Sequence, residues 1–250
     1  MKYKKDIDYN SCDMKLLERF FTYGKGVFIC AVFAVLFYKS IIAFFLLLPF
    51  SHFYVSLKKK QKIKERKQKL ALEFLEGMKS IAGALNAGYS AENSFEEAYR
   101  DLSLIYTRDA DIMREFYSII HKIQMNCTVE HALEDFAMRS DVEEIMDFAE
   151  VFATAKRTGG DMIKIIKNTC KVIEGKLEMQ REIDISIAGK RYEANIMNLV
   201  PLGIIAYMWF FSSDFMKPMY HNITGIMIMT IALLVYLIAY FLSQKIVNFE

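Results

Sequence analysis

Acidic side chains are concentrated in the middle of this 250-residue chain. Residues 91–150 contain 15 acidic and five basic side chains, a formal charge of −10, whereas residues 156–191 carry a formal charge of +4. Charge of one sign on one surface accelerates and orients association with a surface of the opposite sign. We therefore predict that the acidic region binds a basic protein partner. The candidate contacts are six acids near two predicted helix starts: Glu92, Glu96, Glu97, Glu130, Glu134 and Asp135.

Residue patterns that support catalysis or metal binding are missing from the sequence. It contains no G-x-x-x-x-G-K-[ST] phosphate loop, no H-E-x-x-H pair and no G-x-S-x-G nucleophile turn. The histidines are scattered, at positions 52, 121, 131 and 221, and the four cysteines form no C-x-x-C pair. The sequence therefore predicts a protein that is not an enzyme, with no cofactor and no metal site.

The six acids lie in two similar stretches that are offset by 38 residues. Each stretch has a residue that tolerates left-handed backbone, Gly88 or Asn126, and a hydroxyl residue two positions later, Ser90 or Thr128. Two interpretations are open. General helix-capping preferences produce both starts, or a helical hairpin has been duplicated.

Two apolar blocks, residues 26–57 and 194–242, flank the charged middle of the chain. The second block holds two segments of about 20 residues, which is the length that crosses a bilayer. Lys39 interrupts the first block, so either one long tilted helix or two short helices can be drawn there. Lysine and arginine cluster on both sides of this block, and such flanks favour the cytoplasm. We therefore predict a membrane hairpin that turns near Lys39, and four crossings in all.

The predicted fold is all-α: an integral membrane protein in which an antiparallel cytoplasmic bundle of about six helices lies between two pairs of transmembrane helices. Both termini and the main domain are expected on the cytoplasmic side of the cell membrane. The basic run at residues 58–69 follows a spanning segment, which favours contact with lipid headgroups over nucleic acid. The predicted segments are a cytoplasmic N-terminal segment (1–19), a hairpin of two short transmembrane helices (20–57), a cytoplasmic helical domain (58–193), a third transmembrane helix (194–213), an external loop (214–222), a fourth transmembrane helix (223–242) and a cytoplasmic tail (243–250).

Capping residues predict where the helices of the charged middle begin and end. Gly88 is expected to end a first helix that begins near Lys58, because glycine accepts left-handed backbone at a helix C-terminus. Hydroxyl and acidic side chains accept hydrogen bonds from the first free N–H groups of a helix, which predicts the following starts. These are Ser90 for the second helix, Asp109 or Asp111 for the third, Thr128 for the fourth, a Ser140–Glu143 capping box for the fifth, and Asp161, after Gly159 and Gly160, for the sixth.

These turns, in this order and membrane context, resemble those of the type II secretion F-domain family. The resemblance is closest to the short inner-membrane platform proteins of tight-adherence (Tad/Flp-type) pilus systems, and it covers roughly residues 35–250. The matching segments are 37–40, 75–101, 148–163 and 245–250. Residues at its motif positions are Gly88, Ser90, Arg157, Thr158, Gly159, Gly160 and Pro201. Helix termination with close packing, or direct contact with a partner, would explain them.

The resemblance implies a platform that couples a hexameric secretion ATPase in the cytoplasm to the assembly of pilins or pseudopilins. It also implies pairing with a sister platform protein or with a second copy of the chain, contact with membrane lipids, and no catalytic residues. A different class of protein would fit the same acidic helical domain. That alternative is a membrane-anchored signalling or scaffold adaptor.

Overall fold

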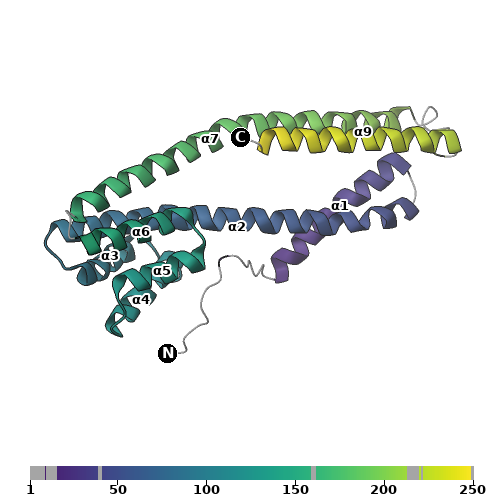
Figure 1. Ribbon diagram of the computed structural model, residues 1–250. Coiled ribbons are helices and arrows are strands. Elements are labelled where there is room, and N and C mark those ends of the chain that lie inside the picture. The colour runs from purple at the N-terminus through teal and green to yellow at the C-terminus, as the bar shows by residue number, and fades with distance from the viewer. Residues whose placement is uncertain are drawn as a thin grey trace. The chain divides into compact units, whose positions relative to one another are not determined.

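The computed structural model describes residue 9 and residues 16–38, 41–158, 162–212, 220 and 222–248. Every regular element within these ranges is a helix (Figure 1), which confirms the prediction of an all-α chain for the described residues. The helices are α1 (Leu16–Tyr38), α2 (Ile41–Asn86), α3 (Ala91–Ile105), α4 (Asp111–Gln124), α5 (Val129–Ser140), α6 (Glu143–Thr158), α7 (Met162–Phe211) and α9 (Ile223–Asn248).

The chain divides into two compact units. The helical unit comprises Met1–Asp13 and Lys60–Met179, and the apolar unit comprises Met14–Lys59 and Gln180–Glu250. Helices α2 and α7 each run without a break from one unit into the other. The boundaries predicted after residues 57 and 193 therefore fall inside helices, and the second helix of the predicted hairpin is not short. The composition changes there, but lysine, glutamate, glutamine and arginine favour helix much as leucine does.

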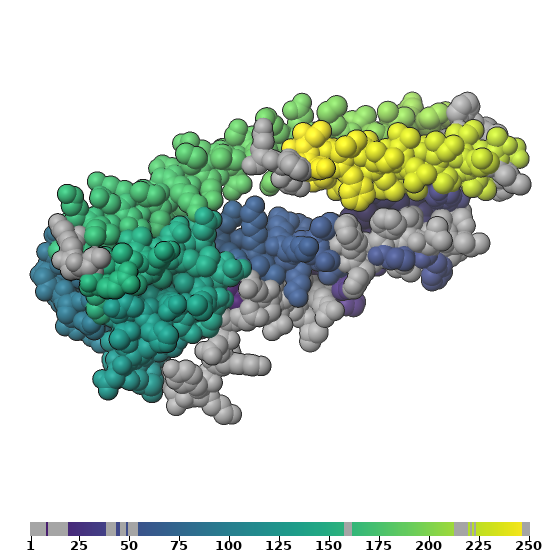
Figure 2. Space-filling view, viewed as in Figure 1, coloured from purple at the N-terminus to yellow at the C-terminus, as the bar shows by residue number. Residues whose placement is uncertain are grey.

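The helical unit is built around the C-terminal part of α2. Helices α3 to α6 form one closely packed lobe in the space-filling view (Figure 2). Phe74 of α2 lies at the centre, with ring centroids of Phe116, Phe136 and Phe148 at 6.4, 5.8 and 5.4 Å. The apolar stripe predicted on this helix is confirmed, because all of its members are buried: Phe74, Leu75, Met78, Ile81, Ala82 and Leu85.

The two similar stretches adopt the same local conformation. Gly88 and Asn126 have φ values of +92° and +64°, so both are left-handed. The hydroxyl oxygens of Ser90 and Thr128 accept hydrogen bonds from the backbone N–H groups of Asn93 and His131, at 3.2 and 3.4 Å. The predicted helix end at Gly88 and the predicted caps at Ser90 and Thr128 are confirmed. Shared capping and hairpin duplication both account for this likeness.

Replacing Gly88 with valine should destabilise the helical unit by roughly 1–2 kcal/mol, because a Cβ strains left-handed backbone. A Cβ at this position would meet no atom within 4 Å, so the cost is conformational and not a steric clash. Gly88→Asn is the matched control. Asparagine should cost much less, since Asn126 holds the equivalent position. Urea unfolding of the full chain in detergent, followed by circular dichroism, measures both variants, and equal losses would contradict the assignment.

The capping box predicted for Ser140 and Glu143 is wrong. Ser140 is the last residue of α5, it is buried, and its hydroxyl donates to the carbonyl oxygen of Ala137 at 3.1 Å. Asp141 takes left-handed backbone, with φ at +50°, and ends the helix. Aspartate is one of the few residues besides glycine that visit this conformation. Helix α6 therefore begins at Glu143, three residues after the predicted cap.

The third helix of the charged middle begins at Asp111, one of the two aspartates predicted at its start, but neither Asp109 nor Asp111 is its cap residue. The cap position of α4 is Ala110, which makes no side-chain cap bond, and Asp111 is the first helical residue. Both carboxylate oxygens of Asp111 instead accept hydrogen bonds from Arg66 of α2, at 2.7 and 2.8 Å. A carboxylate in the first turn is also favoured by the helix dipole. A tertiary ion pair thus replaces the expected local cap.

Three of the predicted turn residues, Gly159, Gly160 and Asp161, lie outside the described residues, as does the side chain of Thr158. Helix α6 ends at Thr158 and α7 begins at Met162. Pro201 lies inside α7, which continues to Phe211. A proline within a spanning helix is tolerated where neighbouring groups satisfy the freed carbonyl.

The apolar unit contains α1, the first part of α2, the second part of α7, and α9. Within the part of the chain that the structure describes, three helices hold segments long and apolar enough to cross a membrane: Phe20–Tyr38, the C-terminal part of Met162–Phe211, and Thr224–Ile246. Tyrosine hydroxyls join these helices. Tyr38 donates to Thr230 Oγ1 at 3.0 Å, and Tyr236 donates to the carbonyl oxygen of Asn198 at 3.0 Å. The chain therefore has the composition of a membrane protein.

The predicted hairpin falls partly outside the described residues. Helix α1 ends at Tyr38 and α2 begins at Ile41. The boundary between the two helices therefore falls at the position of the predicted turn. Lys39 and Ser40 themselves lie outside the described residues, as do many side chains between residues 41 and 54 and most of the loop at 214–222. The number of crossings in this part of the chain stays a prediction.

Candidate functional site

Two of the six candidate acids meet at one lysine. Glu92 lies in the first turn of α3 and Glu130 in the first turn of α5. Lys156 of α6 places its Nζ 3.5 Å from Glu92 Oε1 and 3.1 Å from Glu130 Oε2. These acids are equivalent positions of the two similar stretches. The N-terminal ends of α3 and α5 are therefore held together by a shared cation, which the sequence analysis had assigned to a separate basic region.

The other four acids differ in how far they are already paired. Asp135 accepts hydrogen bonds from Lys122 and from Arg139 Nε, the latter at 2.8 Å. Glu97 pairs with Arg100 on the same helix at 3.3 Å. Glu96 accepts only a neutral hydrogen bond among the contacts described, from Gln124 Nε2 at 3.3 Å. Glu134 lies 3.4 Å from a His131 nitrogen, and that ring is charged only when protonated.

Of the candidate docking residues, Glu96 and Glu134 are thus the ones best placed to attract a cationic partner. Both side chains are exposed. Each lies one helical turn after an acid that Lys156 holds, because Glu92 and Glu130 precede them by four residues. We call Glu92, Glu96, Glu130 and Glu134 the acidic face.

Local contacts keep two of the candidate acids ionised. The pKa of Glu92 is lowered, first by a hydrogen bond with its own backbone N–H at the helix start and then by Lys156. Burial would raise the pKa of Asp135, but hydrogen bonds from Lys122 and Arg139 outweigh it and lower the pKa. A carboxylate whose pKa is lower in the folded state stabilises the fold fully at pH values above its unfolded-state pKa. This stabilisation is lost as the pH falls through the folded-state pKa. Both carboxylates therefore stay charged at neutral pH.

A buried polar network lies beside this surface and was not predicted from the sequence. Glu115 of α4 has a side chain only 2% exposed, and it accepts two hydrogen bonds from the Arg139 guanidinium, at 3.0 and 2.7 Å. Arg139 also binds Asp135, so one guanidinium joins α4 to α5 and fixes an acid of the candidate set. One sequence signal pointed to it. Glu115 sits on the apolar stripe of α4, next to Phe116 and between Ile112 and Ile119.

Tyr9 completes this network from a distant part of the chain. Its side chain is fully buried, and its hydroxyl donates to Glu115 Oε1 at 2.9 Å across 106 residues of sequence. The guanidinium carbon of Arg66 lies 4.7 Å from the centre of the Tyr9 ring. The pKa of Tyr9 is raised, first by burial and then by the negative charges of Glu115 and Asp111. The hydroxyl is therefore protonated and acts as a donor.

The residues at the resembling motif positions, where they are described, lie at one turn and within two helices. Gly88 and Ser90 form the turn before α3. Arg157 is exposed in the last turn of α6. Pro201 lies within α7. Gly159, Gly160 and the Thr158 side chain lie outside the described residues, and their role stays a prediction.

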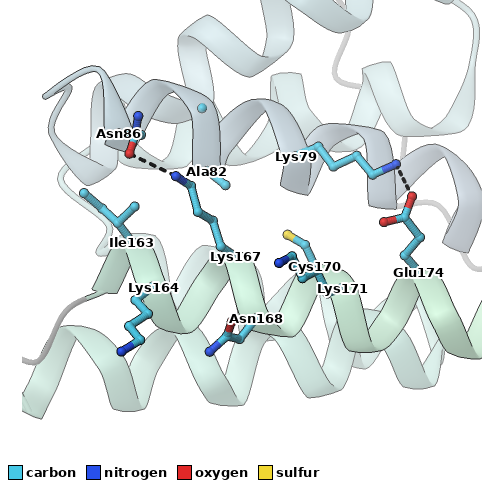
Figure 3. Close-up of a pocket in the computed structure, with 11 residues that line it drawn as sticks. Lys79, Ala82, Asn86, Ile163, Lys164, Lys167, Asn168, Cys170, Lys171 and Glu174 are labelled. Carbon is cyan, nitrogen blue, oxygen red and sulfur yellow. Dashed lines mark hydrogen bonds and ion pairs between the residues drawn. The ribbon is translucent and has the colours of Figure 1, made fainter.

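A pocket of about 670 Å³ lies between α2 and α7 within the helical unit (Figure 3). Small residues on α2, Ala82 and Gly83, line one side. Polar contacts cross the gap at two points: Lys79 Nζ to Glu174 Oε1 at 2.8 Å, and Lys167 Nζ to Asn86 Oδ1 at 3.0 Å. Lys164 and Asn168 point away from α2 in Figure 3. The side chains that cross the gap bind one another, and we assign no ligand to it.

Among the described residues, no group of three or more histidine, cysteine, aspartate or glutamate side chains is arranged to hold a metal ion. Comparisons of the chain with protein-family models, with curated proteins and with solved structures found no match. The function proposed next rests on the sequence motifs and on the geometry of the acidic face.

Proposed function

We propose that the chain is an inner-membrane platform protein of a type II secretion or type IV (Tad-like) pilus assembly machine, coupling a cytoplasmic secretion ATPase to pilin assembly. The observation that carries the proposal is the acidic face. The N-terminal ends of α3 and α5 carry these carboxylates on one packed helical lobe. Lys156 pairs with Glu92 and Glu130 and so holds the two helix ends in place. Such a surface suits docking of a basic partner, because charge complementarity sets orientation and on-rate.

Coupling also needs a rigid path from the docking surface to the membrane segments. The acidic face is tied to α6 through Lys156, and the lobe is packed through the Phe74 cluster to α2. Helices α2 and α7 both continue beyond the helical unit. In this proposal, force applied by the ATPase at the acidic face is carried by packed side chains into those two helices.

The proposed topology has four crossings, with both termini and the helical unit in the cytoplasm, and with the helices of that unit forming an antiparallel bundle between the two membrane pairs. The basic flanks of the first apolar block support this orientation. Further proposed partners are pilins or pseudopilins, a sister platform protein or a second copy, and anionic lipid headgroups at residues 58–69. No nucleic-acid partner is proposed.

The Glu96→Lys/Glu134→Lys variant should bind its partner secretion ATPase about tenfold more weakly than the parent, mainly through a slower on-rate. The parent interaction should weaken as salt rises, because exposed charges are screened. The measurement is surface plasmon resonance with the full chain in lipid nanodiscs, at several salt concentrations. These two acids are chosen because neither holds a lysine or arginine among the described contacts.

Glu178→Lys/Glu182→Lys is the matched control, since it makes the same change in net charge at two exposed acids of α7 that do not belong to the acidic face. It should bind nearly as well as the parent. Equal weakening by both variants would show a net-charge effect only. If neither variant nor salt changes the affinity, the ATPase docks elsewhere. If the ATPase does not bind at all, the adaptor alternative gains support.

A further inference from the structure

Charged side chains from three helices of the helical unit surround the Tyr9 side chain. They are Arg66 from α2, Asp111 and Glu115 from α4, and Arg139 from α5, which together we call the receptor. Each charged group is held by another protein group. Arg66 makes two hydrogen bonds to Asp111, and Arg139 makes two to Glu115. The receptor groups are therefore oriented independently of the tyrosine that they contact.

The receptor matches both ends of a tyrosine side chain. The guanidinium of Arg66 lies 4.7 Å from the ring centre, within the range of a cation–π contact. Glu115 Oε1 accepts the phenol hydroxyl at 2.9 Å. Phenylalanine would satisfy the ring contact but would leave a buried carboxylate without this donor. Glu115 Oε1 would keep only the hydrogen bond from Arg139, and losing a hydrogen bond to a buried charged group is costly, so the site should favour tyrosine over phenylalanine.

We propose that this site is a peptide-recognition pocket for a tyrosine side chain, and that the chain's own N-terminal segment is the ligand, bound through Tyr9. Complete burial of Tyr9 and its three-helix surroundings make it the anchor of the segment. Buried tyrosines that fill a pocket typically dominate the binding of a peptide. Only six residues separate Tyr9 from the start of α1 at Leu16, so the ligand is tethered at high effective concentration. The inference does not depend on the proposed platform function.

The test uses the full chain without residues 1–13, in detergent micelles, and a fluorescent peptide of residues 1–14 added in trans. The wild-type peptide should bind in an anisotropy titration. A Tyr9→Phe peptide should bind at least about tenfold more weakly, because it loses a hydrogen bond to a charged group. A Tyr9→Ala peptide should not bind measurably. The sequence offers a matched control in Tyr3, and a Tyr3→Phe peptide should bind like the wild type.

Failure of the wild-type peptide to bind, or equal binding of the Tyr9→Phe and Tyr3→Phe peptides, would overturn the proposal. A second measurement on the intact chain covers the case in which the shortened chain does not fold. Hydrogen–deuterium exchange over residues 1–15 should become faster in Tyr9→Phe and should stay unchanged in Tyr3→Phe. Unchanged exchange in both variants would also overturn it.

Discussion

Replacing Arg139 with methionine should lower the free energy of unfolding of the helical unit by about 3–5 kcal/mol. The Glu115 side chain is only 2% exposed and accepts both of its guanidinium hydrogen bonds from Arg139. Without Arg139, a buried carboxylate would lose its counter-ion, and Asp135 would lose one of its two cationic donors. Urea unfolding of the full chain in mild detergent, followed by circular dichroism, measures the loss.

Arg114→Met is the control for this effect. It removes the same kind of side chain from α4, but Arg114 is exposed and its partner Asp109 is 94% exposed. Exposed pairs contribute about 0–1 kcal/mol, so little change is expected. The double variant Glu115→Leu/Arg139→Met should recover part of the loss, because it removes the buried charge along with its partner. If Arg139→Met were no worse than Arg114→Met, the buried network would not support the fold.

Gly77→Ala should destabilise the helical unit by roughly 1–3 kcal/mol, the usual cost of overfilling a core. A Cβ at Gly77 would lie 2.5 Å from Cζ of Phe116. Phe116 cannot easily move, because it is fully buried and its ring packs against Phe74 and Phe95, with centroids 6.4 and 5.9 Å away. The clash should outweigh the gain that alanine normally gives inside a helix. Thermal and urea unfolding of the full chain would show the loss.

Gly83→Ala provides a control on the same helix with the opposite expected sign. Gly83 is exposed, and a Cβ there would meet no atom within 4 Å. Only helix propensity changes, so the variant should be more stable by about 0.5–1 kcal/mol. If both glycine variants shifted stability in the same direction, the close contact between α2 and α4 would not be as described.

Local rules account for most of what the sequence predicts correctly about the fold. The stripe around Phe74 follows from helical periodicity, and the caps at Ser90 and Thr128 follow from hydrogen bonding within one turn. The same rules fail at Ser140, because a serine three residues before a glutamate can equally end the preceding helix. At residues 57 and 193 hydropathy changes but helix propensity does not, and α2 and α7 continue through these positions.

The sequence predicts the negative charge of the candidate site, but it does not predict which side chains pair with its acids. Counting acids and bases along the chain identifies an acidic region, and it places Lys156 in a separate basic region. The fold brings that lysine between Glu92 and Glu130. Contacts between Glu115 and Arg139, and between Tyr9 and Glu115, span 24 and 106 residues. Such long-range pairs leave no periodic pattern in the sequence. The one sequence signal for a buried pair is Glu115, an acid on the apolar stripe of α4.

The position of Tyr9 in the helical unit has a consequence for the order of events during synthesis. Tyr9 leaves the ribosome 130 residues before Arg139, which completes its receptor. At bacterial or eukaryotic elongation rates this delay is on the order of ten seconds. All of α1 and α2 are made within that interval. Tyr9 therefore cannot complete its surroundings until α5 has been made, and a nascent chain stalled before α4 would lack the Glu115 carboxylate that the Tyr9 hydroxyl binds.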